Sequence, residues 1–477
     1  MSELSSRSAY LPKPADKKIR IPRVRPWRVL LPVIPKSKSS VPRSIILVYG
    51  FIGLIAIGTI LLMLPISSKS GHFTSFVDAL FTSTSAVCVT GLVVVDTGDY
   101  WNLFGQVVVM LLIQLGGFGF MTSATLFLLA FGRRIGLRER LLIEESMGLQ
   151  KMGGLVNIIK RMAIFTILIE AIGVVIFFIR FIPENSFWTA SWKAIFHSVS
   201  AFNNAGFDIF GNFQSLSGYS ADPLMILVTA VLIILGGISF LVVANIFEVK
   251  RLRKLSLDSK LVLSTTLSLL VLGAIIVLLT EINDPDTLGA MTLPQKVLNA
   301  FFQSVTARTA GFSTVNVANI ADYALFFTML LMFIGGASGS TAGGIKVNTF
   351  GMLTATVWST IRGRERAGVF GREFVPQQIH RALTVVLLSI GLLAIVVFLL
   401  TVTEEFRFLD LLFETISAFG TVGLSTGVTP GLSTVGRLII TVTMFVGRLG
   451  PLTLMLALIQ RQHPATYRYP EEAIRIG

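Results

Sequence analysis

The chain has 477 residues, of which 53% are hydrophobic and only 14% charged, and its mean hydropathy is +0.76. Soluble domains carry about 25% charged residues, whereas here the apolar residues gather into runs of about twenty, the length that crosses a ~30 Å hydrocarbon layer. The composition therefore indicates a polytopic membrane protein. Cys88 is the only cysteine and there are four histidines, which excludes a disulfide scaffold and argues against a Cys/His zinc site.

The net charge of +14 is concentrated in four segments. These are 1–43, with eleven basic and two acidic residues, 131–162, with seven and three, and 248–260 and 361–382, each with five and two. The positive-inside rule makes these segments cytoplasmic. The charge therefore predicts orientation, not a nucleic-acid partner: a multi-pass protein of the cytoplasmic (inner) membrane with both termini in the cytoplasm.

The N-terminal segment 1–43 is basic and contains seven prolines, with no apolar core of a signal peptide. We expect a disordered cytoplasmic arm that contacts anionic membrane lipid. A second cytoplasmic tail is expected over 461–477.

Eight apolar runs are long enough to cross the bilayer. They lie near 44–64, 101–131, 156–182, 223–247, 260–281, 322–334 (resuming to about 361), 381–403 and 433–460. Shorter apolar segments lie between successive pairs, and twelve helical residues reach only ~18 Å. Because consecutive basic segments on one side require an even number of crossings, each short segment is expected to be re-entrant, facing protein or a wet cavity.

The four short segments align without gaps. They read VDALFTSTSAVCVTGL (77–92), WKAIFHSVSAFNNAGF (192–207), VLNAFFQSVTARTAGF (297–312) and LDLLFETISAFGTVGL (409–424). The fifth position is always Phe (Phe81, Phe196, Phe301, Phe413), and the fifteenth is always Gly (Gly91, Gly206, Gly311, Gly423). The phenylalanines are expected to pack each short helix against its flanking spans, whereas four equivalent glycines indicate a shared function.

Four such loops packed around one axis would form a pore. The C-terminal, negative end of each short helix would point to the centre, and glycine permits a positive φ that turns carbonyl oxygens inward. A ring of carbonyls suits a dehydrated monovalent cation, K⁺ or Na⁺. The expected ion-binding residues are Cys88, Val89, Thr90, Gly91, Asn203, Asn204, Ala205, Gly206, Arg308, Thr309, Ala310, Gly311, Gly420, Thr421, Val422 and Gly423.

The predicted fold class is an all-α membrane protein. It has four helix–pore loop–helix repeats around a pseudo-fourfold pore, with eight transmembrane helices and four re-entrant pore helices. The repeats are expected over 44–131, 156–247, 260–361 and 380–460, and the third has a broken inner helix.

The motifs TSTSAVCVTGL, SAFNNAGF, TARTAGF and SAFGTVGL, together with FIGGASGSTAGGIK and FVGRLGPLT, resemble those of the Trk/Ktr/HKT superfamily of potassium transporters. The similarity covers nearly the whole chain after residue 40 and is strongest to Ktr membrane subunits, because an extra N-terminal hairpin is absent and TYRYPEEAI resembles a Ktr ending. Gly91 in the first repeat implies a preference for K⁺. The resemblance further implies a homodimer, a cytoplasmic ring of nucleotide-binding regulatory subunits that carries ATP or ADP, and activation by Na⁺.

The inner helices also align, and Gly117, Gly237 and Gly336 correspond to Arg448 in the fourth. At ~8 Å and an effective dielectric near 20, this charge would oppose a passing K⁺ by ~2 kcal/mol; alternatively, Arg448 binds carbonyls freed by a helix break, and both roles can hold. The segment 335–344 has five glycines, and relatives use the matching segment as an intramembrane gate. The expected gate comprises Gly335, Gly336, Ala337, Ser338, Gly339, Ser340, Thr341, Ala342, Gly343, Gly344 and Arg448.

Five other residues carry individual expectations. Arg308 is expected to form an outward ion pair. Lys346 either anchors the gate segment or extends toward lipid, and we favour the second role. Glu170 should accept hydrogen bonds from the loop backbone or from an asparagine at 203 or 204, and His197 should be a packing residue. Cys88 should react slowly with an external thiol reagent.

Two other classes of protein are less compatible with the sequence than a cation pathway. A polytopic membrane enzyme would need paired carboxylates or histidines at membrane depth, and the sequence offers only Glu170 there. A transporter built from inverted repeats is disfavoured because the basic segments make all four repeats face the same way. Asp96 and Asp99 at the outer side either concentrate cations or form a solvated rim.

Overall fold

The computed structural model describes residues 43–119, 122–123, 155–249, 251–450 and 472. These residues are helical apart from loops and one hairpin, in which β1 (Gly368–Val369) pairs antiparallel with β2 (Arg372–Glu373). The all-α class is therefore confirmed for the described part of the chain. Almost all of the expected tails over 1–43 and 461–477, most of 131–162 and the ends of the runs 101–131 and 433–460 lie outside it.

The main helices form four groups of three, each with a short middle helix. The first group is α1 (Arg43–Met63), α2 (Phe76–Cys88) and α4 (Leu103–Phe118), and the second is α7 (Leu155–Phe181), α8 (Phe187–Phe202) and α9 (Pro223–Gly237). The third is α11 (Leu257–Glu281), α12 (Leu293–Thr306) and α13 (Asp322–Phe333), and the fourth is α15 (Pro376–Thr403), α16 (Phe408–Gly420) and α17 (Thr434–Leu449). The connecting helices are α3 (Thr97–Tyr100), α10 (Phe240–Val249) and α14 (Val347–Ile361).

Local capping fixes where several of these helices begin. The side chains of Ser75, Ser186 and Ser433 accept hydrogen bonds from the first-turn amides of α2, α8 and α17. At α12, Thr292 and Gln295 form a capping box. These side chains satisfy amides that have no partner within the helix, so three of the short helices, α2, α8 and α12, start at a capped residue.

A serine fastens the middle helix to the first helix in three of the groups. Ser83 Oγ donates to Ile55 O at 2.8 Å, Ser198 Oγ to Glu170 O at 2.7 Å, and Ser304 Oγ to Leu270 O at 2.9 Å. In each case a glycine three residues further along the long helix faces that serine (Gly58, Gly173 and Gly273). The missing side chain lets the two helices approach closely, while the serine hydroxyl satisfies its own bonding need on a backbone carbonyl.

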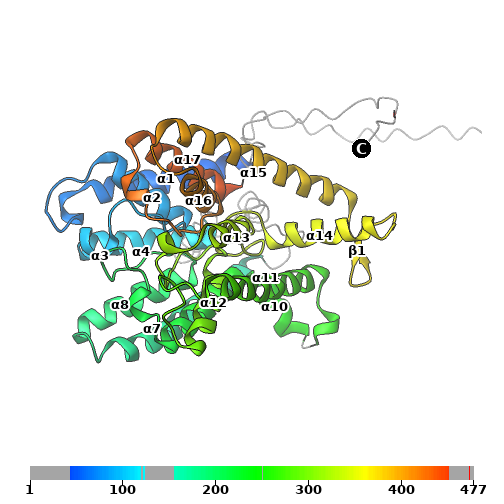
Figure 1. Cartoon of the computed structure of the whole chain (residues 1–477), viewed down its shortest axis with the longest axis horizontal. Helices are drawn as coiled ribbons and strands as arrows, with labels where there is room; N and C mark the ends of the chain where they lie inside the picture. Colours follow the sequence, from blue (N-terminus) through cyan, green and yellow to red (C-terminus); the bar gives the residue numbers. More distant parts are fainter. Residues whose placement is uncertain (1–42, 120–121, 124–154, 250, 451–471, 473–477) are drawn as a thin grey trace, which may run out of the picture. The chain divides into compact units, whose positions relative to one another are not determined.

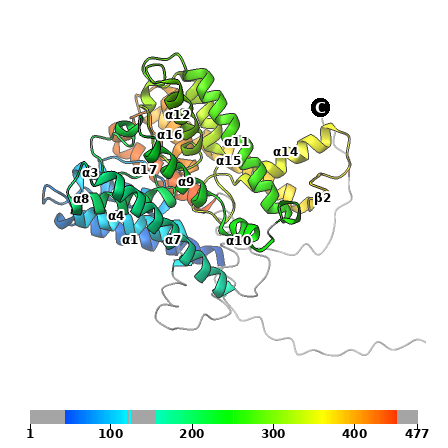
Figure 2. The same ribbon diagram turned by 90° about the horizontal axis from the view of Figure 1, so that it is seen from below.

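The four groups pack in chain order, and the last returns to the first. The third helix of each group contacts the middle helix of the next: α4 with α8, α9 with α12, α13 with α16, and α17 with α2. The colours in Figure 1 follow this path, and α17, near the end of the described chain, lies again beside α1 and α2, while Figure 2 shows the same helices from below. Polar contacts close each junction: Trp192 Nε1 to Gln106 Oε1 (2.7 Å), Asn299 Nδ2 to Ser220 O (2.9 Å), Arg407 to Asp322 (3.0 Å) and Arg437 to Asp78 (2.6 Å).

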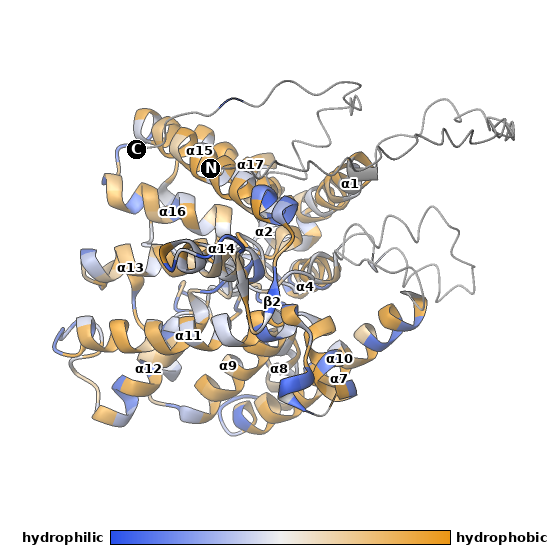
Figure 3. Cartoon of the chain, turned by 90° about the vertical axis from the view of Figure 1, so that its right-hand side faces the viewer, coloured by the Kyte–Doolittle hydropathy of each residue, from blue (hydrophilic) through white to orange (hydrophobic). Residues whose placement is uncertain are grey.

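Among the described residues, three helices are long and apolar enough to span a membrane: Val156–Phe181, Leu257–Glu281 and Pro376–Thr403. Their outer faces carry exposed apolar side chains, and Figure 3 shows apolar colouring along most helices. The run near 223–247, expected as one crossing, consists of two helices, α9 and α10, with a bend of 90° between them. The bend follows Gly236 and Gly237, whose carbonyls bond to the segment 335–344 in place of continuing the helix.

Candidate functional site

The loops that follow the four middle helices share one backbone conformation. Their first left-handed residues have φ of 57°, 58°, 74° and 49° (Val89, Asn204, Thr309, Thr421). The glycines two residues later have φ of 91°, 71°, 76° and 92° (Gly91, Gly206, Gly311, Gly423). The residue between them is not left-handed, so the sign of φ alternates along each loop. Alternation of this kind directs successive carbonyls to one side of the chain.

The amides of these loops are already used by their own helices. Thr90 N donates to Ser85 O at 2.8 Å, Ala205 N to Ser200 O at 2.8 Å and Val422 N to Ser417 O at 2.9 Å. Gly91 N and Gly423 N donate to the hydroxyls of Ser85 and Ser417, both at 3.1 Å. With the donors bound on the helix side, the loop carbonyls are the groups left to interact with a ligand.

Left-handed φ at a β-branched residue is a feature that the sequence analysis missed. Val89, Thr309 and Thr421 are unfavourable in this region, and such positions cost about 1–3 kcal/mol each and cluster at functional sites. Asn204 tolerates the conformation better. The sequence analysis expected positive φ only at the glycines. Of the four residues, only Asn204 is of a type that often adopts positive φ, so only this position could have been predicted from its residue type.

The four glycines form a ring in chain order. A Cβ atom placed on any one of them would lie 3.0–3.1 Å from the Cα atom of the next glycine. The order of these contacts is Gly91 to Gly206, Gly206 to Gly311, Gly311 to Gly423, and Gly423 back to Gly91. Each would also meet the carbonyl oxygen that precedes the next glycine (Ala205, Ala310, Val422 and Thr90 respectively). Any side chain at these positions would therefore displace backbone of the neighbouring group.

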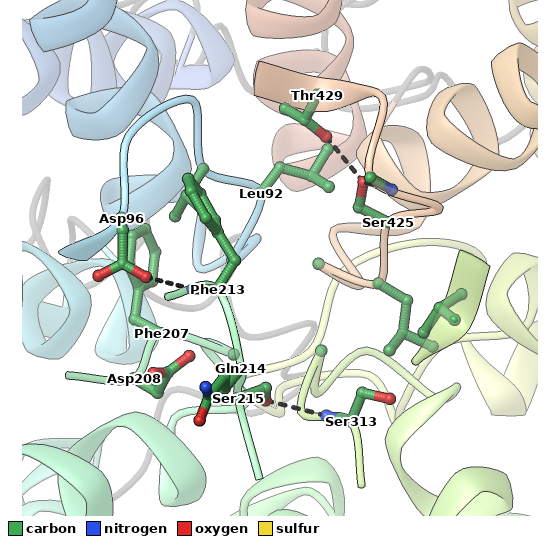
Figure 4. Close-up of a pocket in the computed structure, with 18 of the residues that line it drawn as sticks. Leu92, Asp96, Phe207, Asp208, Phe213, Gln214, Ser215, Ser313, Ser425 and Thr429 are labelled. Atoms are coloured by element: carbon green, nitrogen blue, oxygen red, sulfur yellow. Dashed lines mark hydrogen bonds between the residues drawn. The ribbon is translucent and has the colours of Figure 1, made fainter. Parts of the chain in front are cut away.

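An open cavity of about 470 Å³ lies directly on this ring. All four glycines line it, together with residues of the loops that follow them, among which Figure 4 labels Leu92, Phe207, Ser313 and Ser425. Its carboxylates include Asp96 and Asp208. The cavity is thus a mouth shared by the four groups.

Asp96 and Asp99 brace a strained loop at this mouth. Gly211, Asn212 and Phe213 are all left-handed, and Asn212 N donates to Asp99 Oδ2 at 2.7 Å while Phe213 N donates to Asp96 Oδ2 at 2.6 Å (Figure 4). The two carboxylates therefore hold the loop, a role that neither sequence alternative included.

Asp208 lies beside them. Burial raises the pKa of Asp208 to about 7, and the negative charges of Asp96 and Asp99 contribute to this rise to a smaller extent. The hydrogen bond that Asp208 accepts from Phe210 N acts in the opposite direction and lowers the pKa. Its charge therefore changes near neutral pH.

The glycine-rich segment 335–344 interrupts the helix after the third middle helix. α13 ends at Phe333 and α14 begins at Val347. Ala337 N donates to Gly237 O at 3.0 Å, and Thr341 bonds to Gly236 O through both its amide (3.3 Å) and its hydroxyl (3.1 Å). The segment also packs beneath the loops, since a Cβ on Gly343 would lie 3.0 Å from Thr421 Cβ.

Arg448 joins this segment to two other groups. Its guanidinium on α17 donates to Thr341 O and to Gly116 O on α4. Gly116 in turn lies against Val87 of α2. Arg448 therefore binds a carbonyl of the helix break at 335–344 and a second carbonyl at the end of α4. The bond to the break agrees with the second of its two expected roles, and it falls on the segment expected to form a gate.

Two expectations about cations are wrong. Instead of an outward ion pair, the buried Arg308 directs Nη1 to Thr266 O and Nη2 to Gly335 O, both at 3.5 Å. Lys346 does not extend toward lipid; its Nζ donates to Ala342 O at 2.5 Å and to Gly343 O at 3.3 Å. The segment 335–344 supplies both acceptors of Lys346 and one of the two acceptors of Arg308, while the other, Thr266 O, lies on α11.

The remaining expectations concern buried groups. Glu170 Oε1 accepts from Asn203 Nδ2 at 3.0 Å, and His197 packs against Phe177 and bonds to Thr229 at 3.1 Å, which confirms both expectations. The Cys88 side chain is fully buried in the core, which disfavours reaction with an external reagent.

The sequence analysis also missed a buried carboxylate. Glu414 on α16 is fully buried and accepts hydrogen bonds from Ser425 and Thr429 at the mouth.

The fold is that of a helical membrane protein. Its candidate site is the ring of loops, in which backbone carbonyl oxygens are the groups available to a small ligand. Residues 36–466 match the model of the family described as TrkH, cation transport protein. The chain belongs to this family, which is one of transport proteins and not of enzymes.

Relatives and a solved structure are similar over almost the whole chain. Ktr system potassium uptake protein B of Bacillus subtilis is 42% identical over 432 residues, which cover 91% of this chain and 96% of that protein. Potassium/sodium uptake protein NtpJ of Enterococcus hirae is 41% identical, covering 90% and 96%. The crystal structure of the potassium transporter TrkH from Vibrio parahaemolyticus aligns with a TM-score of 0.69 at 21% identity, over 89% of this chain and 86% of that one, and so shares the fold.

Proposed function

We propose that this chain is the translocating subunit of a K⁺ uptake system of the cytoplasmic membrane. The ion passes through the ring of glycine loops, and the carbonyl oxygens of residues 88–91, 203–206, 308–311 and 420–423 replace its hydration shell. The observation that carries the proposal is the closed contact of Gly91, Gly206, Gly311 and Gly423, each against the backbone of the next.

In this proposal the four helix groups are the four pore repeats, over 44–131, 156–247, 260–361 and 380–460. Eight spans cross the bilayer, and the four short middle helices are re-entrant. The direct packing of α17 on α2 supports a closed fourfold arrangement, because it joins the last group to the first.

The segment 335–344 and Arg448 form the gate of this pathway. The contacts of Arg448 with Thr341 and Gly116 support this role, since they fasten a non-helical segment across two helix groups directly below the ring. Opening requires these contacts to break, and a conformational change in a bound partner can supply the energy.

The relatives' names and the sequence resemblance supply the wider setting. The chain forms a homodimer on a cytoplasmic ring of nucleotide-binding subunits, which carries ATP or ADP, and Na⁺ activates uptake. The words "Ktr system" and "potassium/sodium" in the names of similar proteins support a multi-subunit system and a role for Na⁺.

Rescue of a K⁺-uptake-deficient bacterium at micromolar K⁺ tests the proposal. The wild type should restore growth, and Gly311→Ala should abolish it, because its φ of 76° disfavours a side chain and its Cβ would lie 3.1 Å from the Cα atoms of Gly206 and Gly423. Gly218→Ala is the matched control, since nothing lies within 4 Å of its Cβ. Wild-type growth after Gly311→Ala would contradict the proposed pathway.

A further inference from the structure

A second, much smaller cavity lies between α11, α12 and α13. Its volume is about 10 Å³, close to the minimum for a single water-sized occupant. The polar side chains that line it are those of Glu281, Thr287, Asn299, Gln303 and Thr328. It is separate from the ring, since its lining includes none of the four glycines, and it adjoins the large mouth at Val315, which lines both cavities.

Several polar atoms of this cavity lack a partner among the described residues. They are Glu281 Oε1, Asn299 Oδ1 and both side-chain polar atoms of Gln303. The three side chains are buried, with exposures of 2%, 1% and 2%. Buried polar atoms are nearly always bonded, so the three orphaned oxygens of side chains that line one cavity indicate an occupant.

The orientation of two of these side chains is fixed by other contacts. Asn299 Nδ2 donates to Ser220 O and to Gln295 O, both at 2.9 Å, which leaves Oδ1 free for the cavity. Glu281 Oε2 accepts from Thr287 Oγ1 at 2.7 Å, which leaves Oε1 free. Gln303 Oε1 adds a third acceptor oxygen.

The charge of the cavity favours a cation over water. None of the ion pairs among the described residues includes Glu281, and a buried carboxylate stays charged only where it is paired or binds a metal. A carboxylate and two amide oxygens are hard ligands, which suit alkali and alkaline-earth cations. One carboxylate balances a monovalent charge, and the small volume favours Na⁺ over K⁺.

We propose that Glu281, Asn299 and Gln303 bind a Na⁺ ion in this cavity. Asn299 and Gln303 lie on α12, which leads directly into the loop of Gly311, while Glu281 ends α11. A bound ion would therefore fix α12 to α11 and hold that loop in place. This consequence for uptake rests on the proposed function; binding itself does not.

The experiment measures thermal unfolding of the purified full-length protein in nanodiscs. Saturating K⁺ fills the proposed ion pathway, and NaCl then replaces choline chloride at constant ionic strength. The wild type should show a transition temperature that rises with Na⁺ concentration, as expected when a ligand binds only the folded state. Glu281→Gln should remove this rise, and the control Asp286→Asn, a nearby exposed carboxyl, should retain it.

Gln303→Leu roughly preserves side-chain volume, and it is the second test of the site if Glu281→Gln fails to fold. It removes one ligand, so the Na⁺ concentration at half-maximal stabilisation should rise about tenfold. The absence of a Na⁺-specific rise in the wild type, or an unchanged response in either variant, would overturn the proposal.

The binding result and the uptake result are independent. Na⁺-dependent stabilisation without any K⁺ uptake would support the site and contradict the proposed function. K⁺ uptake without Na⁺-dependent stabilisation would support the proposed function and contradict the Na⁺ site.

Discussion

Replacement of Arg448 by Ala should raise the flux of K⁺ in the absence of the regulatory partner. The guanidinium makes two hydrogen bonds to carbonyls, one on the segment 335–344 and one on α4. Both hold the segment across the proposed pathway. Their loss should favour an open arrangement.

The magnitude follows from these two bonds and from the charge. A hydrogen bond to a charged group contributes about 1.5–3 kcal/mol, so the pair contributes about 3–6 kcal/mol. Even the lower figure of about 3 kcal/mol changes the ratio of open to closed molecules by about 150-fold. Removal of the positive charge also lowers the barrier to K⁺ by ~2 kcal/mol at ~8 Å. Both effects have the same sign.

The assay is ⁸⁶Rb⁺ uptake into proteoliposomes that contain the purified chain alone. Arg448→Lys separates the two effects, because it keeps the charge but loses the planar guanidinium that reaches two carbonyls. Flux should be high in both variants if the two hydrogen bonds of Arg448 dominate, and high only in Arg448→Ala if its charge dominates. Arg366→Ala, which removes an exposed ion pair with Glu373, is the control.

Unchanged flux in both Arg448 variants would refute the reasoning. So would a loss of flux in correctly folded protein. Either result would leave Arg448 as a structural residue only.

Three further predictions concern the mouth, the core and a junction between helix groups. The pKa of Asp208 is raised to about 7, so lowering the external pH from 8 to 6 neutralises its carboxylate. At roughly 8 Å between this carboxylate and a K⁺ ion, in a water-like dielectric, the lost attraction is about 0.5 kcal/mol. The KM for K⁺ should therefore rise about twofold in the wild type and stay unchanged in Asp208→Asn. Because Cys88 is buried, an impermeant thiol reagent added outside should leave initial uptake rates unchanged, and a block that Cys88→Ala escapes would disprove this. Arg437→Ala removes a partly buried pair with Asp78 and two bonds to carbonyls, so it should lower stability by about 1–3 kcal/mol and the Tm accordingly; Arg407→Ala, whose partner is exposed, should leave the Tm unchanged.

Local sequence patterns predicted the features that depend on local geometry. The alignment of four short segments identified the glycines that adopt positive φ in all four loops. Hydrophobic runs located the long helices α7, α11 and α15 to within a few residues. The five glycines of 335–344 predicted a break, and this segment is not helical.

Prediction failed where a polar side chain chooses among distant partners. Arg308 and Lys346 were assigned an ion partner and lipid, yet both bond to backbone of the segment 335–344. A sequence indicates that a buried cation needs acceptors, but not that carbonyls at a helix break will supply them.

The sequence by itself determined the membrane character, the family and the four equivalent loops, because hydropathy and repeat spacing are properties of neighbouring residues. The tertiary structure alone decided how these parts meet. Arg448 bonds to residues 107 and 332 positions away, and Glu281, Asn299 and Gln303 enclose a cavity only because α11 packs on α12. Contacts of this range depend on the packing of helices in three dimensions, which the spacing of residues along the chain does not encode.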